Sequence, residues 1–200
     1  SFYHEKLNPF EKDELVIVSC AKIRDVKRIH LIAEALMHID IPCKWFHLGD
    51  ENLDAKNDES IPKYIKAKEE LIHSKHIQMT AMGAKDNEDI YKFYEFTPIT
   101  AFISVSASEG IPVSMMEAIS FGIPVISTDV GGCKEIVTPN SGTLIPKDSS
   151  PEQIAKSILD FYSSNMNSIE FRQKVREYWL KTFDMRSNYK QLFEILHNGV

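Results

Sequence analysis

The chain alternates short β-branched runs with longer amphipathic runs, and this order constrains its fold more than any other feature. Four consecutive strand–helix pairs are predicted from it. The pairs cover residues 15–19 and 29–37, 44–48 and 62–72, 77–82 and 87–94, and 101–105 and 112–121. Consecutive units of this kind place parallel strands in one sheet with helices between them. We therefore expect an open, Rossmann-like α/β sheet with helices on both faces.

The pattern changes beyond the fourth pair. Two short strands bounded by Gly or Pro are predicted at residues 124–127 and 142–145, which brings the sheet to about six strands. A helical C-terminal tail follows, with helices predicted at 151–162, 169–182 and 187–197. The expected division is an interdomain linker remnant at 1–14, the Rossmann-like domain at 15–165 and C-terminal helices at 166–200.

Composition excludes several classes of protein. Asp and Glu number 29 against 23 Lys and Arg, a net charge of -6 that argues against binding nucleic acid. Cys20, Cys43 and Cys133 are odd in number and far apart, so neither a disulfide framework nor a zinc site is indicated, and a cytoplasmic setting is expected. The seven histidines lack metal-binding spacing, and no fingerprint of dinucleotide binding, ATP hydrolysis or serine hydrolysis is present.

The loop after the fourth predicted strand is the most informative part of the chain. Ligands of open parallel sheets bind at the carboxyl ends of the strands, where this loop lies. Gly110 permits an unusual backbone angle and Pro112 suits the first helical position, so free N–H groups at this helix start favour a phosphate. Glu109 and Glu117 lie on either side of this start. They either bind a ligand or act as a helix cap and an exposed charge. The apolar neighbours of Glu117 favour a carboxylate that binds hydroxyl groups.

Two other loops carry weaker signals. Gly131 and Gly132 follow the fifth predicted strand, where they either let the backbone approach a ligand or form an ordinary turn. The loop after the first strand carries four cationic side chains, of which at least one arginine is expected to be solvated surface. One or two of the others, facing the sheet edge, would stabilise a pyrophosphate leaving group. The four are Lys22, Arg24, Lys27 and Arg28.

Residues 109–137, EGIPVSMMEAISFGIPVISTDVGGCKEIV, contain two glutamates eight positions apart, then Gly-x-Pro-Val, Gly-Gly and a further Glu. On this motif the chain resembles the C-terminal, donor-binding domain of retaining group 1 glycosyltransferases. Those enzymes have two Rossmann-like domains that face a cleft, the GT-B arrangement. The resemblance extends from about Asn8 to the end of the chain.

The resemblance implies a role for each matching residue. Glu109 would contact the donor sugar near its anomeric centre, and Glu117 the ribose hydroxyls. Lys22 and Lys27 would hold the diphosphate, although Lys22 stands where the family commonly has Arg and lacks its bidentate fork. Ala21 replaces a family glycine. The implied donor-binding residues are Met82, Gly83, Ser108, Gly110, Ile111, Pro112, Val113, Glu117, Gly131 and Gly132.

The resemblance also implies the reaction. A sugar would pass from a nucleotide-diphosphate-sugar to an acceptor hydroxyl with retained configuration, without a metal or other cofactor, in cell-surface polysaccharide or glycolipid synthesis. An N-terminal domain, absent from this sequence, would bind the sugar or lipid-linked acceptor and receive the last helix. We therefore expect this chain alone to be inactive. The full-length protein would be cytoplasmic, either free or associated with the inner face of the membrane.

Two other functions are consistent with the residues. One is a non-catalytic module that binds a nucleotide-sugar. A coding frame that continues upstream into another Rossmann-like half would favour the enzyme over this module. The other is a sugar-nucleotide epimerase, which shares the two-domain fold but differs in the motif around the glutamates. Donor base, donor sugar and acceptor stay open.

Overall fold

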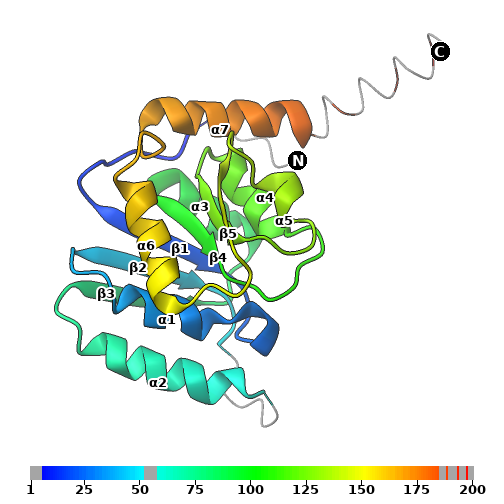
Figure 1. Ribbon diagram of the computed structural model, residues 1–200. Coiled ribbons are helices and arrows are strands. Elements are labelled where there is room, and N and C mark those ends of the chain that lie inside the picture. Colours follow the sequence, from blue (N-terminus) through cyan, green and yellow to red (C-terminus); the bar gives the residue numbers. More distant parts are fainter. Residues whose placement is uncertain (1–5, 52–57, 185–187, 189–192, 194–196, 198–200) are drawn as a thin grey trace.

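The computed structural model describes residues 6–51 and 58–184, together with Asn188, Phe193 and His197. Within them lies one parallel six-stranded sheet in the order β3-β2-β1-β4-β5-β6. The strands are β1 (Leu15–Cys20), β2 (Cys43–Leu48), β3 (Ile77–Gly83), β4 (Ala101–Ser104), β5 (Val125–Thr128) and β6 (Gly142–Ile145). This order places β1 beside β4 in the middle of the sheet (Figure 1).

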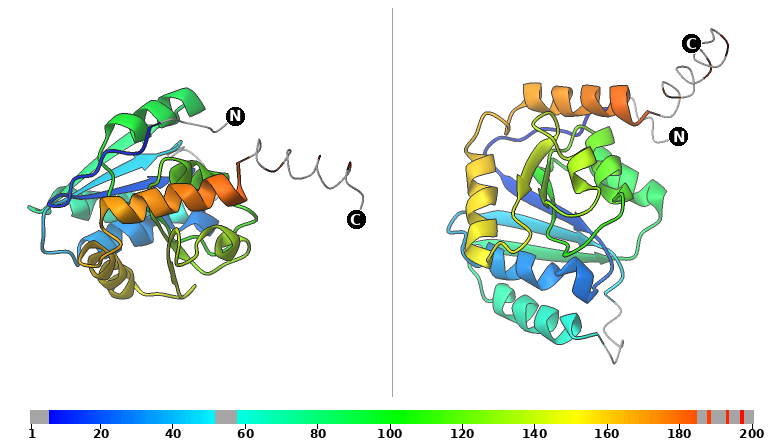
Figure 2. Two further views of the ribbon diagram at one scale, coloured as in Figure 1. Left: turned by 90° about the horizontal axis from the view of Figure 1, so that it is seen from above. Right: turned by 45° about the vertical axis from the view of Figure 1, so that its right-hand side comes forward.

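Helices cover both faces of the sheet. They are the 3-10 turn η1 (Asp25–Lys27) and the helices α1 (Ile29–Leu36), α2 (Ser60–Ile72), α3 (Asn87–Phe96), α4 (Val113–Ser120), α5 (Cys133–Ile136), α6 (Pro151–Tyr162) and α7 (Ile169–Thr182). Helix α1 packs against α2 and α6, whereas α4 packs against α7. Figure 2 shows α3 on the opposite side of the sheet from α1 and α6. The predicted Rossmann-like α/β fold is thereby confirmed.

The central strands are apolar on both faces because both faces are covered. All residues from Leu15 to Val18 of β1 are at most 2% exposed, and Phe102 and Ile103 of β4 are similarly buried. Strands of a sheet with helices on one face only would alternate polar and apolar residues instead. The continuous β-branched runs of the sequence therefore follow from the position of these strands.

Most predicted element bounds agree with the structure within two residues, and the start of α6 is confirmed at Pro151. There the Ser150 hydroxyl accepts a hydrogen bond from the Gln153 backbone, and the Gln153 side chain accepts one from the Ser150 N–H. The prediction that Pro112 occupies the first helical position is wrong by one residue. Pro112 has an extended backbone (φ -74°, ψ 102°) and precedes α4, which begins at Val113. The elements η1 and α5 were not predicted separately, because runs of three or four residues carry no periodicity.

The segment before β1 is tied to α7 by buried polar contacts. The Arg172 guanidinium, which is 1% exposed, donates to Asn8 Oδ1 over 2.9 Å and also to the Ile99 carbonyl oxygen. The Asn8 amide in turn donates to the Thr97 carbonyl oxygen over 2.8 Å. Three segments far apart in the sequence therefore meet at one guanidinium.

The helix predicted at 187–197 lies outside the described residues, except for Asn188, Phe193 and His197. The domain boundaries after residues 14 and 165 stay predictions.

Candidate functional site

The loops after β1 and β4 lie side by side because the two strands are neighbours. The Ala107 N–H donates to the Val26 carbonyl oxygen over 2.8 Å. Arg28 donates to the carbonyl oxygens of Val105 and Ser106, over 2.7 and 3.1 Å, and to that of Lys147 over 2.8 Å. Arg28 is therefore a structural connector of three loops. Arg24 is exposed, as expected for at least one of the two arginines.

Lys27 and Glu109, 82 positions apart, meet at this edge of the sheet. Lys27 Nζ lies 2.6 Å from Glu109 Oε1, and the Ser106 hydroxyl donates to the same oxygen over 2.6 Å. The Glu109 side chain is only 10% exposed, whereas that of Lys27 is 29% exposed. Of the basic loop, the structure thus brings Lys27 to the first motif glutamate.

Glu117 lies on α4 and is 6% exposed, so the alternative that it is an exposed helical charge is wrong. The Tyr91 hydroxyl, from α3, donates to Glu117 Oε1 over 3.1 Å. Burial raises the pKa of Glu117, and the hydrogen bond from Tyr91 opposes that rise. A carboxylate held in this way can bind hydroxyl groups of a ligand.

Cys20, the last residue of β1, feels the charges of both Glu117 and Lys27. Its thiol pKa is raised to about 11, first by burial and then by the charge of Glu117, while Lys27 opposes the shift. Both groups are therefore within electrostatic reach of the same sulfur. Glu117 and the pair of Lys27 with Glu109 belong to one site at the carboxyl edge of β1 and β4.

The glycine pair after β5 packs against the loop that carries Glu109. The Gly132 N–H donates to the Gly110 carbonyl oxygen over 2.9 Å. Gly131 has a φ of +50°, and a Cβ there would lie 1.8 Å from the Glu109 carbonyl oxygen. The two loops can approach this closely only because neither glycine has a side chain.

The loops after β1, β2 and β3 are also joined by backbone hydrogen bonds. Ala21 N–H donates to the Leu48 carbonyl oxygen and Gly49 N–H to that of Gly83, each over 2.9 Å. Met82 and Gly83 end β3 and are partly exposed on this edge. Lys22 is exposed and forms no ion pair among the described residues. The structure therefore places these three predicted residues on the edge of the site, apart from Glu109.

The start of α4 presents a mixed surface. Ile111 is 58% and Val113 50% exposed, and Ser108 and Gly110 are exposed as well. Of the predicted donor-binding residues from Gly110 to Val113, Pro112 cannot donate a backbone hydrogen bond to a ligand, because proline has no N–H. Val113 begins α4, and the dipole of this helix favours an anion at its start.

The structure adds Ser106, Tyr91 and Arg28 as supporting residues. Ser106 is 1% exposed, and the Thr128 hydroxyl donates to its carbonyl oxygen over 2.7 Å. It lies three residues before Glu109, the spacing of a helix capping box, but no helix begins there and its hydroxyl donates directly to the carboxylate, so this signal would not have identified the contact. No local signal connects Tyr91 to Glu117, because the pairing depends on how α3 packs beside α4.

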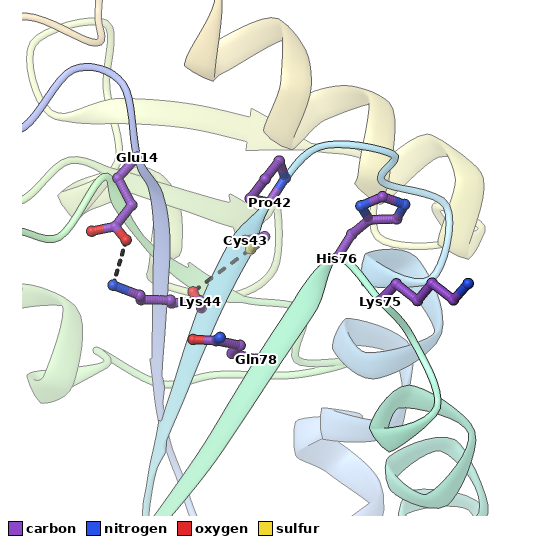
Figure 3. Close-up of a pocket in the computed structure, with 7 residues that line it drawn as sticks. All are labelled: Glu14, Pro42, Cys43, Lys44, Lys75, His76 and Gln78. Carbon is purple, nitrogen blue, oxygen red and sulfur yellow. Dashed lines mark hydrogen bonds and ion pairs between the residues drawn. The ribbon is translucent and has the colours of Figure 1, made fainter.

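A separate surface pocket of about 230 Å³ lies at the opposite edge of the sheet. Figure 3 shows Lys44 paired with Glu14 across it. Residues at or next to the amino ends of β1, β2 and β3 line the pocket, and neither motif glutamate is among them. Its lining residues are Glu14, Pro42, Cys43, Lys44, Lys75, His76 and Gln78.

Comparison with known families agrees with the motif. The family described as glycosyl transferases group 1 matches residues 3–181. The chain belongs to the group 1 glycosyltransferase family. Within the described residues, no helix is long and apolar enough to cross a membrane.

Two curated relatives show how far the group 1 similarity extends. The UDP-N-acetylglucosamine–peptide N-acetylglucosaminyltransferase GtfA subunit of Streptococcus agalactiae is 26% identical over 170 residues, which are 82% of this chain and 31% of the relative. The putative colanic acid biosynthesis glycosyltransferase WcaL of Salmonella typhimurium is 24% identical over 191 residues, 91% of this chain and 45% of the relative. The chain thus spans less than half the length of these relatives.

A solved structure shares the fold of this group 1 chain. Anabaena HepE in complex with UDP superposes with a TM-score of 0.72 at 16% identity, over 93% of this chain and 49% of that one.

Proposed function

We propose that this chain is the donor-binding half of a retaining glycosyltransferase, which moves a sugar from a nucleotide-diphosphate-sugar to an acceptor hydroxyl. The observation that carries the proposal is the contact of Lys27 with Glu109, at 2.6 Å, on the same sheet edge as the buried Glu117. Glu109 and Glu117 belong to the motif at residues 109–137, Lys27 stands at a position that the resemblance assigns to the diphosphate, and the family itself is identified over residues 3–181. Retention of configuration rests on the resemblance to retaining enzymes.

Each proposed role follows from the chemistry of the side chain. Negative charge develops on the diphosphate as the sugar leaves, and a lysine ammonium with the start of α4 would stabilise it. Lys27 is the first candidate for this contact and the exposed Lys22 the second. Glu109 would accept hydrogen bonds from sugar hydroxyls, and Glu117 from the ribose. The loop of Gly131 and Gly132 would hold the backbone of Glu109 in position through the packing of these glycines against it.

No metal is needed in this proposal, because cationic side chains and the helix dipole supply the positive charge. A transfer rate that is unchanged by EDTA, measured on the full-length protein, is the expected result. A rate that falls with EDTA and recovers with Mg²⁺ would contradict this part of the proposal.

The class of donor and the biosynthetic role are proposed from the relatives. WcaL is named for colanic acid biosynthesis, and HepE was solved with UDP, so a nucleotide-sugar donor and a role in cell-surface polysaccharide synthesis are the proposed class. A sugar or lipid-linked acceptor would be bound through a second domain. We propose that the protein is cytoplasmic and that it binds a lipid-linked acceptor at the inner face of the membrane.

A binding panel tests the donor site. Thermal unfolding of the chain is measured with UDP-, GDP-, ADP- and dTDP-sugars, and calorimetry then gives the dissociation constant of the nucleotide that stabilises it most. We expect one base to be preferred, the diphosphate to bind more tightly than the nucleoside, and affinity to fall with added salt. Lys27→Ala should reduce the diphosphate preference. If no nucleotide shifts the unfolding temperature, the proposal fails.

Turnover by the full-length protein separates the enzyme from the alternatives. Transfer to an acceptor supports a glycosyltransferase. Interconversion of the nucleotide-sugar without an acceptor would indicate an epimerase, and binding without either reaction a non-catalytic module.

A further inference from the structure

Lys27 and Glu109 are both assigned to the donor in the proposed function, yet they are bound to each other. Lys27 Nζ lies 2.6 Å from Glu109 Oε1, so an ammonium that would serve a diphosphate already has a carboxylate partner. A diphosphate that takes Lys27 has to break or share this contact. The donor and Glu109 therefore compete for one cation.

The backbones around the pair leave only the side chains free to rearrange. The Val26 carbonyl is bonded to the Ala107 N–H, and Arg28 holds the carbonyls of Val105 and Ser106. Lys27 follows Val26 and precedes Arg28 directly, so its backbone is fixed next to the loop of Glu109. Exchange between the two partners then needs only rotation of the lysine side chain, which is 29% exposed.

Ser106 supplies a second partner that does not depend on Lys27. Its hydroxyl, in a residue 1% exposed, donates to the same Oε1 over 2.6 Å. Among the described residues, no donor is bonded to the other oxygen, Oε2. When Lys27 turns to a diphosphate, the carboxylate keeps one hydrogen bond and stays in place.

We propose that Glu109 gates Lys27: the carboxylate holds the ammonium until a diphosphate takes it, and Ser106 then retains Glu109 in position for the sugar. This deepens the proposed function and rests on it. The gate lowers affinity for a nucleoside diphosphate, because part of the binding free energy is used to free Lys27. It also predicts that removing the charge of Glu109 tightens diphosphate binding, whereas a glutamate that only contacts sugar would have no effect on it.

The experiment measures diphosphate affinity by calorimetry at low salt. UDP, GDP, ADP and dTDP are tested on the parent chain, and the one that binds most tightly is used for all variants. Glu109→Gln should tighten its binding about threefold to tenfold, because a charge-assisted contact no longer holds the lysine. In the Lys27→Ala background, the same substitution should change affinity by less than about twofold.

A matched variant separates this effect from general relief of negative charge. Glu135→Gln removes one exposed carboxylate on α5, in the neighbouring glycine loop, without a contact to Lys27. It should change affinity by less than about twofold. Thermal unfolding of every variant, without nucleotide, verifies that the fold is retained.

Ser106 gives a test of the opposite sign. Ser106→Ala should weaken diphosphate binding by about twofold to fivefold, because Glu109 then depends on Lys27 alone. This loss should disappear in the Glu109→Gln background. Opposite and mutually dependent effects of neighbouring residues would not arise from simple loss of structure.

The outcomes distinguish the inference from the function on which it rests. If the parent binds a diphosphate but Glu109→Gln does not tighten it, the gate is wrong and the donor site stands. Equal tightening in the presence and absence of Lys27, or by Glu135→Gln, also overturns the gate. If the parent binds none of the four diphosphates, the proposed function fails and the gate with it.

Discussion

Arg28 and Arg172 show what single residues contribute to this fold. Each guanidinium donates to oxygens from segments far apart in the chain, Arg28 to Val105, Ser106 and Lys147 and Arg172 to Asn8 and Ile99. A guanidinium has five N–H donors in a planar fork, so one side chain can donate to several oxygen atoms at once. Lysine, which has a single nitrogen, would make fewer of these contacts at either position.

Glu117→Ala is predicted to weaken binding of the preferred nucleoside diphosphate. Loss of a charge-assisted hydrogen bond to ribose costs about 1.5–3 kcal/mol, which corresponds to roughly tenfold to hundredfold in the dissociation constant. Calorimetry on the folded variant measures it. Tyr91→Phe removes a donor to Glu117 but keeps the carboxylate, and it should weaken binding less. An unchanged dissociation constant in Glu117→Ala would remove this residue from the site.

His47 is predicted to make folding stability depend on pH. The ring is fully buried, and burial lowers its pKa from 6.5 to about 4. Trp45 Nε1–H donates to Ser19 Oγ over 3.0 Å, so the serine hydroxyl hydrogen is free to point at His47 Nδ1, 2.9 Å away. The folded protein therefore holds a neutral ring. The charge of Glu51 raises the pKa of His47, and the charge of Lys68 lowers it.

The sign of this effect follows from proton uptake. Between pH 6.5 and about 4 the unfolded chain binds a proton at His47 that the folded chain excludes, so stability is complete above this window and is lost as pH falls through it. The contribution is on the order of 3 kcal/mol. Urea unfolding at pH 7 and pH 4.5 should show a smaller fall in the free energy of unfolding for His47→Gln than for the parent. Equal falls would contradict the assignment.

At the scale of elements, the site depends on how closely loops approach one another. The loop of Gly131 and Gly132 follows β5, the loop of Glu109 and Gly110 follows β4, and adjacent parallel strands bring them together. Their contact is between backbones, so side-chain volume is what limits it. The close packing of the two loops is enough to explain why glycines stand at 131 and 132, even if they contact no ligand. The same packing holds the backbone of Glu109 in place.

Gly131→Ala is predicted to separate these two loops. The added Cβ would meet the Glu109 carbonyl oxygen at 1.8 Å, and the left-handed backbone adds strain of about 1–2 kcal/mol. We expect a lower unfolding temperature and weaker diphosphate binding. Gly110→Ala is the control for stability, because a Cβ there meets nothing within 4 Å. Similar unfolding temperatures for the two variants would show that the loops can move apart without cost.

At the scale of the whole molecule, the site occupies one edge of one sheet. The proposed donor contacts come from loops after β1, β3, β4 and β5, which this chain contains. Sugar transfer also requires an acceptor hydroxyl held against the anomeric carbon, and such positioning supplies much of the rate of enzymes. The chain spans 31% and 45% of the lengths of GtfA and WcaL.

Binding and turnover are therefore predicted to separate. The 200-residue chain should bind a nucleoside diphosphate weakly and transfer no sugar above background, whereas a protein that joins this chain to an acceptor-binding domain should do both. Product formation with an added acceptor, followed by mass spectrometry, measures the difference. Robust transfer by this chain alone would show that Glu109 and the lysines suffice.

The sequence by itself determined the order of strands and helices and the positions of both motif glutamates. Continuous β-branched runs such as residues 15–18 indicate strands covered on both faces, and Gly or Pro marks where they end. The apolar neighbours of Glu117 favoured a carboxylate that binds hydroxyl groups over an exposed charge, and the structure buries this residue. These features are local, because periodicity, turn residues and caps act over a few positions.

Only the tertiary structure decided which loops meet. The sheet order places β1 beside β4, and this brings Lys27 rather than Lys22 to Glu109 across 82 positions. It also made Arg28 a connector of three loops and paired Tyr91 with Glu117. Such contacts depend on strand order and on how helices pack over the sheet. The same spacing of apolar residues along the chain is compatible with many strand orders and helix packings. The sequence pattern alone therefore does not specify which of them forms.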